Sequence, residues 1–204
     1  MVNQTQLIYI HGGGTHQNRS SFVKFIKHKL TISIEKKIKW SDDYLDHNLK
    51  KDFFVIKPAM PLKENARYLE WKIYFEKYLP FTSDGVVLVG FSLGAFFLVK
   101  YLSENIFPKK ISGIFLIAPP FDNSLPGEEL VGGFKLRQNL SKIYQNCTNI
   151  HFLFSLDDPV IPIEHARKFE QKLDQANYHY LANKNGHFKV SKFPEIIKLI
   201  KKYK

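Results

Sequence analysis

Short apolar runs alternate along the chain with longer stretches in which apolar residues recur at helical spacing. Because strands and helices that alternate in this way are typical of βαβ units, the pattern predicts a mostly parallel sheet covered by helices. The six runs predicted as strands are Leu7–Ile10, Phe53–Ile56, Val86–Val89, Ile111–Ile117, Ile150–Phe154 and Tyr178–Leu181. We therefore expect one α/β domain spanning residues 1–204.

The longer stretches predict helices with one apolar face. These are Ser20–Leu30, Asn65–Tyr78, the stretch that follows Gly94 to about Ser103, Ile163–Leu173 and Pro194–Lys202. Phe22, Phe25 and Ile26 should share the buried face of the first helix, and Leu69 and Ile73 that of the second. Residues Thr31–Lys51 and Phe121–Cys147 lack a clear period and are expected to leave the sheet as irregular excursions.

Composition narrows the function classes. The formal charge is +11, but only four of the 30 basic residues are Arg and no nucleic-acid-binding motif is present, so we expect a solvated basic surface and no nucleic-acid partner.

Cys147 is the single cysteine, which excludes a disulfide framework, and we expect a buried thiol. Neither a metal site nor a cofactor is expected. Met1–Gln6 lacks a signal-like segment and the apolar stretch Val86–Val99 is too short to span a bilayer, so we expect a cytoplasmic protein without a membrane partner.

The clearest chemical motif is Gly90-Phe91-Ser92-Leu93-Gly94, which lies between an apolar strand and an apolar helix. In this G-x-S-x-G context the serine occupies a tight strand-to-helix turn and its hydroxyl projects from the sheet edge. The N–H of Leu93 begins the helix and is placed to bind an oxyanion. Ser92 is therefore a candidate nucleophile, although a tight turn with an incidental serine has the same pattern.

A glycine-rich loop, His11-Gly12-Gly13-Gly14, follows the first predicted strand. Such a loop can supply the second oxyanion N–H, from Gly13 in the first place and from Gly14 next. A dinucleotide-phosphate cradle fits less well, because Gln17 replaces the last glycine of G-x-G-x-x-G and Lys57 ends the second strand where an acid is needed.

Candidates for an acid and a base follow the last two predicted strands. In Ser155–Pro162 the D-x-x-V/I-P pattern favours Asp158 over Asp157, which we expect to cap the turn, and Asp122 is a weaker alternative acid. His187 lies in a loop after the last strand, where a general base is expected, whereas His165 and His179 fall within predicted regular structure.

The order Ser92, Asp158, His187 is the chain order of the α/β-hydrolase triad. With Asp157-Asp158-Pro159 and Gly186-His187-Phe188, the sequence resembles the small serine hydrolases related to the retinoblastoma-binding hydrolase, within the α/β-hydrolase superfamily. The resemblance implies an α/β-hydrolase fold of about six strands with a minimal cap and a triad of Ser92, Asp158 and His187. The L-x-C-x-E segment of the family's namesake is absent, and Thr31–Lys51 looks like an insertion relative to that pattern.

These expectations favour a carboxylesterase-like serine hydrolase that acts on small acyl esters, thioesters or activated amides. Only about thirty residues separate Ile117 from Ile150, so any lid is small and short soluble acyl substrates are favoured. Candidates for substrate contact are Gly14, Phe91 and Phe121. Candidates for the wall of the acyl pocket are Phe96, Phe97, Phe121 and Phe134, and ordinary core packing is an equally good interpretation of each of these four. The alternatives are a binding protein with an inert triad and an acyltransferase; the sequence leaves the natural substrate and the oligomeric state open.

Overall fold

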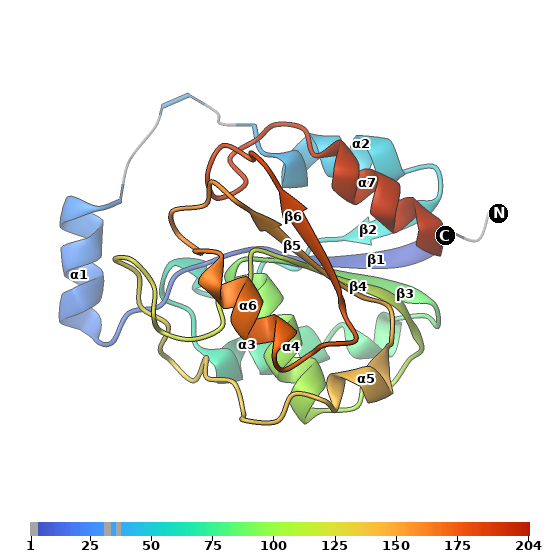
Figure 1. Cartoon of the computed structure of the whole chain (residues 1–204), viewed down its shortest axis with the longest axis horizontal. Helices are drawn as coiled ribbons and strands as arrows, with labels where there is room; N and C mark the ends of the chain where they lie inside the picture. The colour runs from blue at the N-terminus through green and yellow to red at the C-terminus, as the bar shows by residue number, and fades with distance from the viewer. Residues whose placement is uncertain (1–3, 31–33, 36–37) are drawn as a thin grey trace.

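The computed structural model describes residues 4–30, 34–35 and 38–204, and it shows a six-stranded parallel sheet in the order β2-β1-β3-β4-β5-β6 (Figure 1). All six predicted strands are present, and four of them are longer than predicted. The strands are β1 Thr5–Ile10, β2 Phe53–Ile56, β3 Val86–Phe91, β4 Ile111–Ile117, β5 Ile150–Ser155 and β6 Asn177–Leu181.

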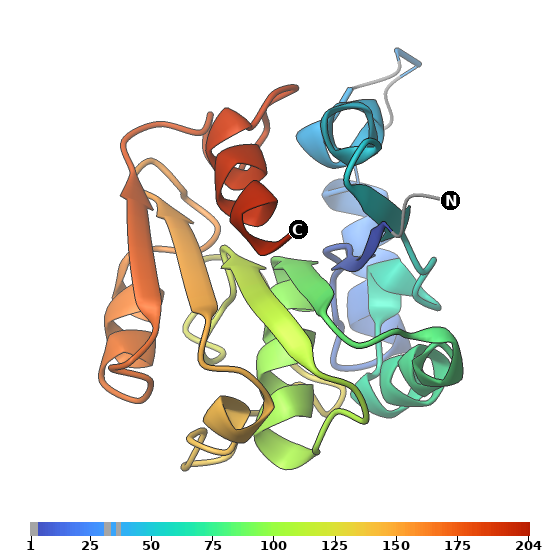
Figure 2. The ribbon, with the colours of Figure 1, turned by 90° about the vertical axis from the view of Figure 1, so that its right-hand side faces the viewer.

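Helices cover both faces of the sheet, as the apolar runs predict. Helices α2 and α7 lie on one face and α3, α4, α5 and α6 on the other, while α1 stands to one side (Figures 1 and 2). Their bounds are α1 Arg19–His28, α2 Leu45–Leu49, α3 Tyr68–Glu76, α4 Leu93–Glu104, α5 Ile143–Asn146, α6 Glu164–Glu170 and α7 Pro194–Ile200. The shorter helical turns are η1 Trp40–Tyr44, η2 Lys63–Asn65, η3 Leu79–Phe81 and η4 Lys201–Tyr203.

Strand β3 and the helix that follows it, α4, are almost wholly buried. Five of the six residues of β3 and nearly all of α4 are buried. Because β3 lies between β1 and β4 and has helices on both faces, its run of apolar residues has no polar side to present. The chain that carries the candidate nucleophile is therefore fixed at the centre of the core.

The predicted buried face of α3 is wrong. Tyr68, Trp71 and Phe75 are buried, whereas the side chains of Leu69 and Ile73 are exposed. Apolar residues occur all round this helix, so the pattern permits two orientations. The one observed buries the three large aromatic rings, which remove more apolar area from water. Similarly, Ile26 of α1 is exposed while Phe22 and Phe25 are partly buried against His16.

Both predicted excursions contain helical structure that the sequence analysis missed. In Thr31–Lys51, residues 31–33 and 36–37 lie outside the described part of the chain, but η1 and α2 follow directly, and Trp40, Leu45 and Leu49 are fully buried. In Phe121–Cys147, α5 ends just before Cys147, whose thiol is buried as expected and has its pKa raised by that burial.

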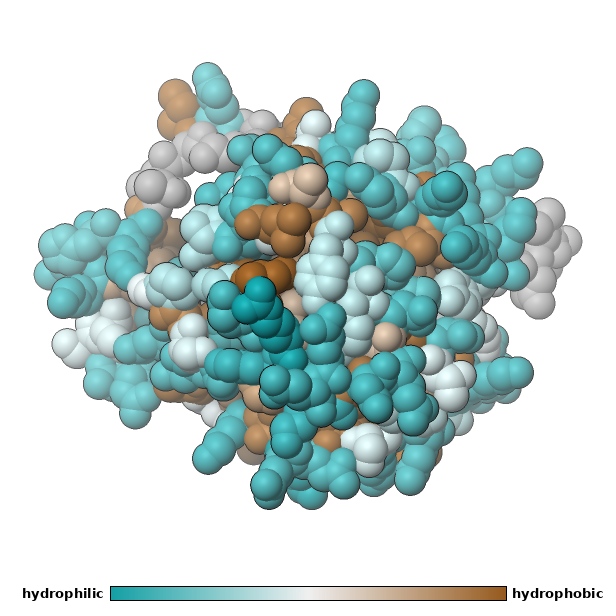
Figure 3. All heavy atoms as spheres, viewed as in Figure 1, coloured by the Kyte–Doolittle hydropathy of each residue, from teal (hydrophilic) through white to brown (hydrophobic). Residues whose placement is uncertain are grey.

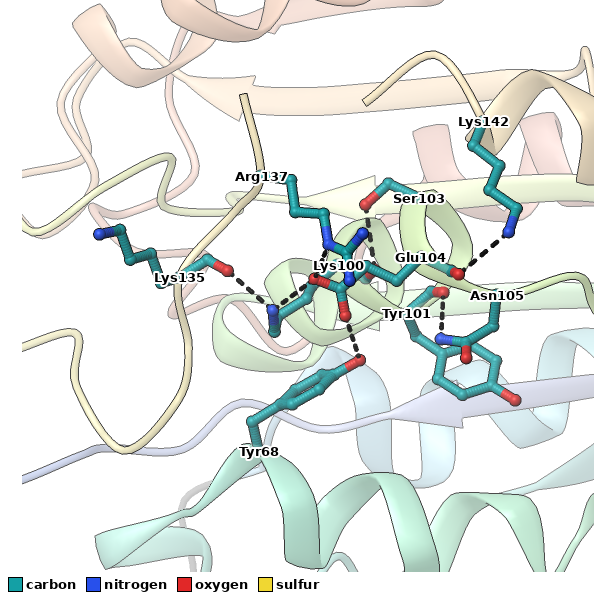
Figure 4. Close-up of polar contacts among 9 residues, drawn as sticks. All are labelled: Tyr68, Lys100, Tyr101, Ser103, Glu104, Asn105, Lys135, Arg137 and Lys142. Atoms are coloured by element: carbon teal, nitrogen blue, oxygen red, sulfur yellow. Dashed lines mark hydrogen bonds and ion pairs between the residues drawn. The ribbon is translucent and has the colours of Figure 1, made fainter. Parts of the chain in front are cut away.

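The second excursion is attached to the distal end of α4 by a polar network (Figure 4). The Lys100 ammonium contacts the Glu104 carboxylate at 2.6 Å and donates to the carbonyl of Lys135 at 2.8 Å. Arg137 contacts the same carboxylate at 3.3 Å, and Lys142 donates to the carbonyl of Glu104. Since Lys100 is buried, these partners satisfy a charge that would otherwise destabilise the fold.

The face of the molecule seen in Figure 3 is largely hydrophilic. In the view of Figure 3 polar side chains cover most of the face, and apolar atoms gather in a narrow band near its middle. Within the described residues, no helix combines the length and the apolar character needed to cross a bilayer.

A stack of aromatic and imidazole rings joins the C-terminus to the sheet. His151 stacks on Phe115 at 4.9 Å, and its two nitrogens contact His179 at 3.0 Å and the Tyr203 hydroxyl at 2.6 Å. Burial, with the positive charges of His179 and Lys202 nearby, lowers the pKa of His151 from 6.5 to about 4. The His151 ring is therefore neutral in the folded protein at neutral pH.

Acid should weaken this contact. Between pH 6.5 and about 4 the unfolded chain protonates His151 and the folded chain does not, so the free energy of unfolding decreases as the pH falls through this range. His151→Phe keeps a ring on Phe115 and removes the titration, so its pH curve from urea denaturation should be shallower than the wild-type curve. The difference in slope should approach one proton, about 1.4 kcal/mol per pH unit. Parallel curves for the two proteins would contradict this assignment.

Candidate active site

Ser92 lies in a strained turn between β3 and α4. Its backbone has φ 52° and ψ −119°, a conformation that L-residues adopt at a cost of about 1–3 kcal/mol. Its N–H donates to the carbonyl of Ile117 at the end of β4, and its carbonyl accepts from the N–H of Phe96 in α4. Neighbouring elements on both sides therefore impose this conformation, which is the strand-to-helix geometry expected of a nucleophile elbow.

The two glycines of the motif let the strand and helix converge. A Cβ on Gly90 would lie 2.5 Å from the Cα of Ala95, and one on Gly94 would lie 2.2 Å from the carbonyl oxygen of Ile10. Real Cβ atoms do not tolerate either distance, so only glycine fits. Leu93 is the first residue of α4, and the first N–H groups of a helix have no acceptor within it.

The glycine-rich loop after β1 lies directly against Ser92. The ideal Cβ position of Gly12 is 3.2 Å from the Cβ of Ser92, and that of Gly13 is 2.4 Å from the carbonyl oxygen of Lys63. The loop is held from the other side as well, because the N–H of Gly14 donates to the carbonyl of Lys63 at 2.8 Å. This segment could not accommodate side chains at Gly13 without displacing the chain around η2.

His11 fixes the orientation of that loop. Its Nε2 accepts from the N–H of Met60 at 3.0 Å, so Nδ1 carries the proton and donates to the carbonyl of Gly12 at 2.6 Å. Burial lowers the pKa of His11 and favours this neutral ring. Because the peptide bond is trans, the N–H of Gly13 points away from the carbonyl of Gly12 and hence from the His11 ring.

His187 and Asp158 form a direct hydrogen bond. Nδ1 of His187 is 2.7 Å from Oδ2 of Asp158, whose side chain is only 1% exposed. The other carboxylate oxygen accepts from the N–H groups of Val160 and Ile161 at 2.9 and 3.0 Å. Asp158 is thus held as an acceptor, and it fixes the tautomer in which Nε2 of His187 is free to act as a base.

The alternative acids have other partners. The Asp157 carboxylate accepts from the N–H groups of Gly186 and Lys184. Asp122 contacts the Lys168 ammonium at 2.7 Å and accepts from Ser124. Although burial acts to raise the pKa of Asp122, these bonds hold it at about 2. Of the three carboxylates, only that of Asp158 is hydrogen-bonded to His187 among the described contacts.

Ser92 and His187 line one large cavity. Its volume is about 1350 Å³, and the glycine-rich loop, Phe91 and Leu93 form part of its wall. The ring of Phe91 packs on the imidazole of His187 at 4.9 Å between centroids. Acyl transfer needs a serine in an elbow, a histidine with its Nδ1 bonded to a buried carboxylate, and N–H groups at a helix N-terminus, and this cavity brings the three together.

Comparison with known proteins assigns the family. The family model described as serine hydrolase matches residues 39–201, most of the chain. The chain belongs to the serine hydrolase family.

Solved structures share this fold over nine-tenths or more of their length. The chain is similar to the ydeN gene product of B. subtilis, with 18% identity, 98% of each chain covered and a TM-score of 0.74. A structure described with carboxylesterases of Nitrososphaera gargenis gives 12% identity, coverage of 100% and 90%, and a TM-score of 0.63. A thioesterase domain from the curacin biosynthetic pathway gives 13% identity, coverage of 98% of this chain and 92% of that domain, and a TM-score of 0.61. No curated protein matches the sequence.

The predicted aromatic wall of this serine hydrolase differs from the arrangement in the structure. Phe96, Phe97 and Phe134 are packed within the core, and Phe121 packs on Phe169 at 4.9 Å between ring centroids. None of these four is among the described residues around the cavity, whereas Phe91 is. Helix α4 turns its phenylalanines towards the core because it is buried along almost its whole length.

Sequence reasoning missed the wall supplied by the first excursion. Residues Ile38–Asp42 line the cavity beside Phe91. The N–H of Trp40 donates to the carbonyl of Val190 at 2.9 Å, and its buried ring contacts those of Phe91 and Phe193 edge-on. The apolar spacing of Trp40, Leu45 and Leu49 is the signal that could have revealed a packed segment here.

The close contact between Gly94 and the carbonyl of Ile10 predicts that a side chain at position 94 destabilises the protein. Gly94→Ala should destabilise the protein by at least about 1–3 kcal/mol, because the new methyl group overlaps the carbonyl of Ile10 in a packed core. Gly14→Ala is the matched control: its methyl group has no neighbour nearer than 3.6 Å, and we expect a change below about 1 kcal/mol. Urea denaturation measures both; equal stability of the two variants would show that the contact at Gly94 is relaxed in solution.

Proposed function

We propose that this serine hydrolase is a carboxylesterase-like enzyme that cleaves small acyl esters, thioesters or activated amides through a triad of Ser92, His187 and Asp158. The observation that carries the proposal is the 2.7 Å bond from His187 to the buried Asp158 carboxylate, on a cavity that the strained Ser92 also lines. The likeness to carboxylesterase and thioesterase structures supports the same reaction class.

In this mechanism His187 removes the proton of the Ser92 hydroxyl, and the serine oxygen attacks the acyl carbonyl. The carboxylate of Asp158 stabilises the imidazolium that forms. His187 then gives the proton to the leaving alcohol, thiol or amine. Water deprotonated by His187 attacks the acyl-enzyme and releases the acid, which restores the serine.

The N–H groups of Leu93 and Gly13 bind the oxyanion of each tetrahedral intermediate. That of Leu93 lies at the positive end of α4, and that of Gly13 is turned away from His11 by the bond between His11 and the carbonyl of Gly12. The loss of one such donor typically costs about 3–4 kcal/mol of transition-state stabilisation.

The cavity surface favours short acyl groups. Charged residues from four separate segments line part of it, beside apolar residues such as Phe91 and Leu93: Lys39, Asp42, Lys57, Lys63, Glu64, Glu128, Glu129 and Lys189. A long alkyl chain lying along such a surface would desolvate charged groups without compensating partners. A small acyl group next to Phe91 and Gly14 would avoid this cost.

The triad is tested by labelling with a fluorophosphonate probe. Wild type should be labelled, and Ser92→Ala and His187→Ala should not, because the first lacks the nucleophile and the second lacks its base. Asp158→Asn should retain the fold and lose about 10⁴-fold in kcat, since an amide favours the wrong imidazole tautomer. An unlabelled but folded wild type would refute the proposal and favour a binding protein.

Substrate size is tested separately with p-nitrophenyl esters. We expect kcat/KM to be highest for acetate and butyrate and to decrease at least tenfold towards the laurate, because the charged cavity wall opposes a long chain. Values that rise steadily up to the longest ester would contradict the small-acyl assignment and leave the triad intact. Added alcohols or amines that divert product from hydrolysis would identify an acyltransferase instead.

A further inference from the structure

Two adjacent aspartates at the end of β5 serve the His187 loop in different ways. Asp158 is buried and contacts the imidazole ring, whereas Asp157 is exposed and turns towards the backbone that precedes His187. Its Oδ2 accepts from the N–H of Gly186 at 2.8 Å, and its Oδ1 accepts from the N–H of Lys184 at 3.0 Å. The Ser155 hydroxyl also donates to Oδ1.

The loop around His187 needs an external restraint of this kind. Asn185, Gly186 and Phe188 have positive φ values of 54°, 71° and 50°. Positive φ is uncommon for residues other than glycine, so Asn185 and Phe188 adopt an unfavourable backbone conformation. The N–H of Phe188 donates to the carbonyl of Gly186 at 2.8 Å, so His187 lies at the apex of a three-residue turn. A backbone bent in this way reverts to commoner conformations unless its surroundings hold it.

The two ends of the turn are held by different forces. On the C-terminal side the Phe188 ring is buried against Phe193 at 5.2 Å between centroids. On the N-terminal side the Lys184 ammonium contacts the Glu195 carboxylate at 2.6 Å and lies over the Phe193 ring, which holds that side chain. The backbone N–H groups of Lys184 and Gly186 are bonded to Asp157 instead. The two bonds to Asp157 join this side to the end of β5, the strand that also presents Asp158.

We propose that Asp157 is a positioning residue that fixes the backbone of the His187 loop so that the imidazole stays in register with Asp158. The inference rests on the proposed role of His187 as the general base. Three bonds also hold the pKa of Asp157 at about 2, the first from the N–H of Gly186, then those from Ser155 and Lys184. The carboxylate therefore remains an acceptor at any working pH.

An amide in place of the carboxylate is the sharpest variant. Asp157→Asn keeps the size of the side chain, but one of its two terminal atoms becomes a donor that faces a backbone N–H. We expect kcat, and the rate of labelling by the fluorophosphonate, to fall by about ten- to a hundredfold, since a misplacement of about 1 Å can cost 10²-fold. KM for a small ester should stay within about twofold.

A matched control separates positioning from ordinary capping. Asp84 is also exposed and also accepts from a backbone N–H, that of Lys110 at 2.8 Å, but it precedes β3 at the opposite end of the sheet. Asp84→Asn should cost comparable stability and leave kcat unchanged. Equal kcat values for Asp84→Asn, Asp157→Asn and the wild type would overturn the proposal.

Two spectroscopic measurements test the mechanism, and the first uses only the wild type, so it does not depend on how well a variant folds. In the wild type, the amides of Lys184 and Gly186 should exchange slowly with solvent despite their exposed surroundings; exchange at the unprotected rate would overturn the proposal. The low-field proton resonance of the His187 Nδ1–H should be sharp in the wild type and in Asp84→Asn. It should be broadened or lost in Asp157→Asn, and an unchanged resonance there would show that Asp158 alone holds the ring.

These measurements also distinguish the two proposals from each other. If wild-type protein is not labelled at Ser92, the hydrolase mechanism fails, while the exchange rates and the imidazole resonance still report whether Asp157 holds the loop. If labelling depends on Ser92 and His187 but not on Asp157, the hydrolase mechanism stands and the positioning role fails.

Discussion

The close approach of β1, β3 and α4 at Gly94 is the contact on which the site depends. At this point the backbone of the helix lies so near the carbonyl of Ile10 that no side chain fits between them. The same convergence forces Ser92 into its positive-φ conformation and brings the glycine-rich loop after β1 against it. Nucleophile geometry and the neighbouring loop are therefore consequences of one packing constraint in the centre of the core.

The remaining parts of the site are placed by loops that hold one another. The His187 loop is bonded to the end of β5 through Asp158 and Asp157, and the first excursion is bonded to it through Trp40 and Val190. The strands end at the same edge of a parallel sheet, so loops that are distant in sequence meet there. At its other end, α4 holds the second excursion through Lys100 and Glu104.

Sequence patterns predicted the features that depend on local chemistry. The central strands β3, β4 and β5 are apolar runs that suit a sheet covered on both faces, and the motif around Ser92 has glycines where the backbone needs them. The patterns failed where two arrangements satisfy the same local rule. Helix α3 has apolar residues on every side, and only the fit of Trp71 and its aromatic neighbours against the core selects the buried face. Trp40 could not be placed for a similar reason, since its partners come from β1, β3 and the segment before α7.

The adjacent residues Asp157 and Asp158 bind different parts of the His187 loop: Asp158 contacts the imidazole ring and Asp157 the backbone before it. Both residues lie in the turn that follows β5, and their two carboxylates reach different targets, the Gly186 N–H and the His187 ring. The buried one can bind a single imidazole strongly because its other oxygen is already satisfied by two N–H groups. The exposed one has water as a competitor, yet it can still restrain a backbone because two N–H groups and a hydroxyl converge on it. Ring orientation and loop conformation are thus controlled by separate side chains, and a change at either position would disturb the base in a different way.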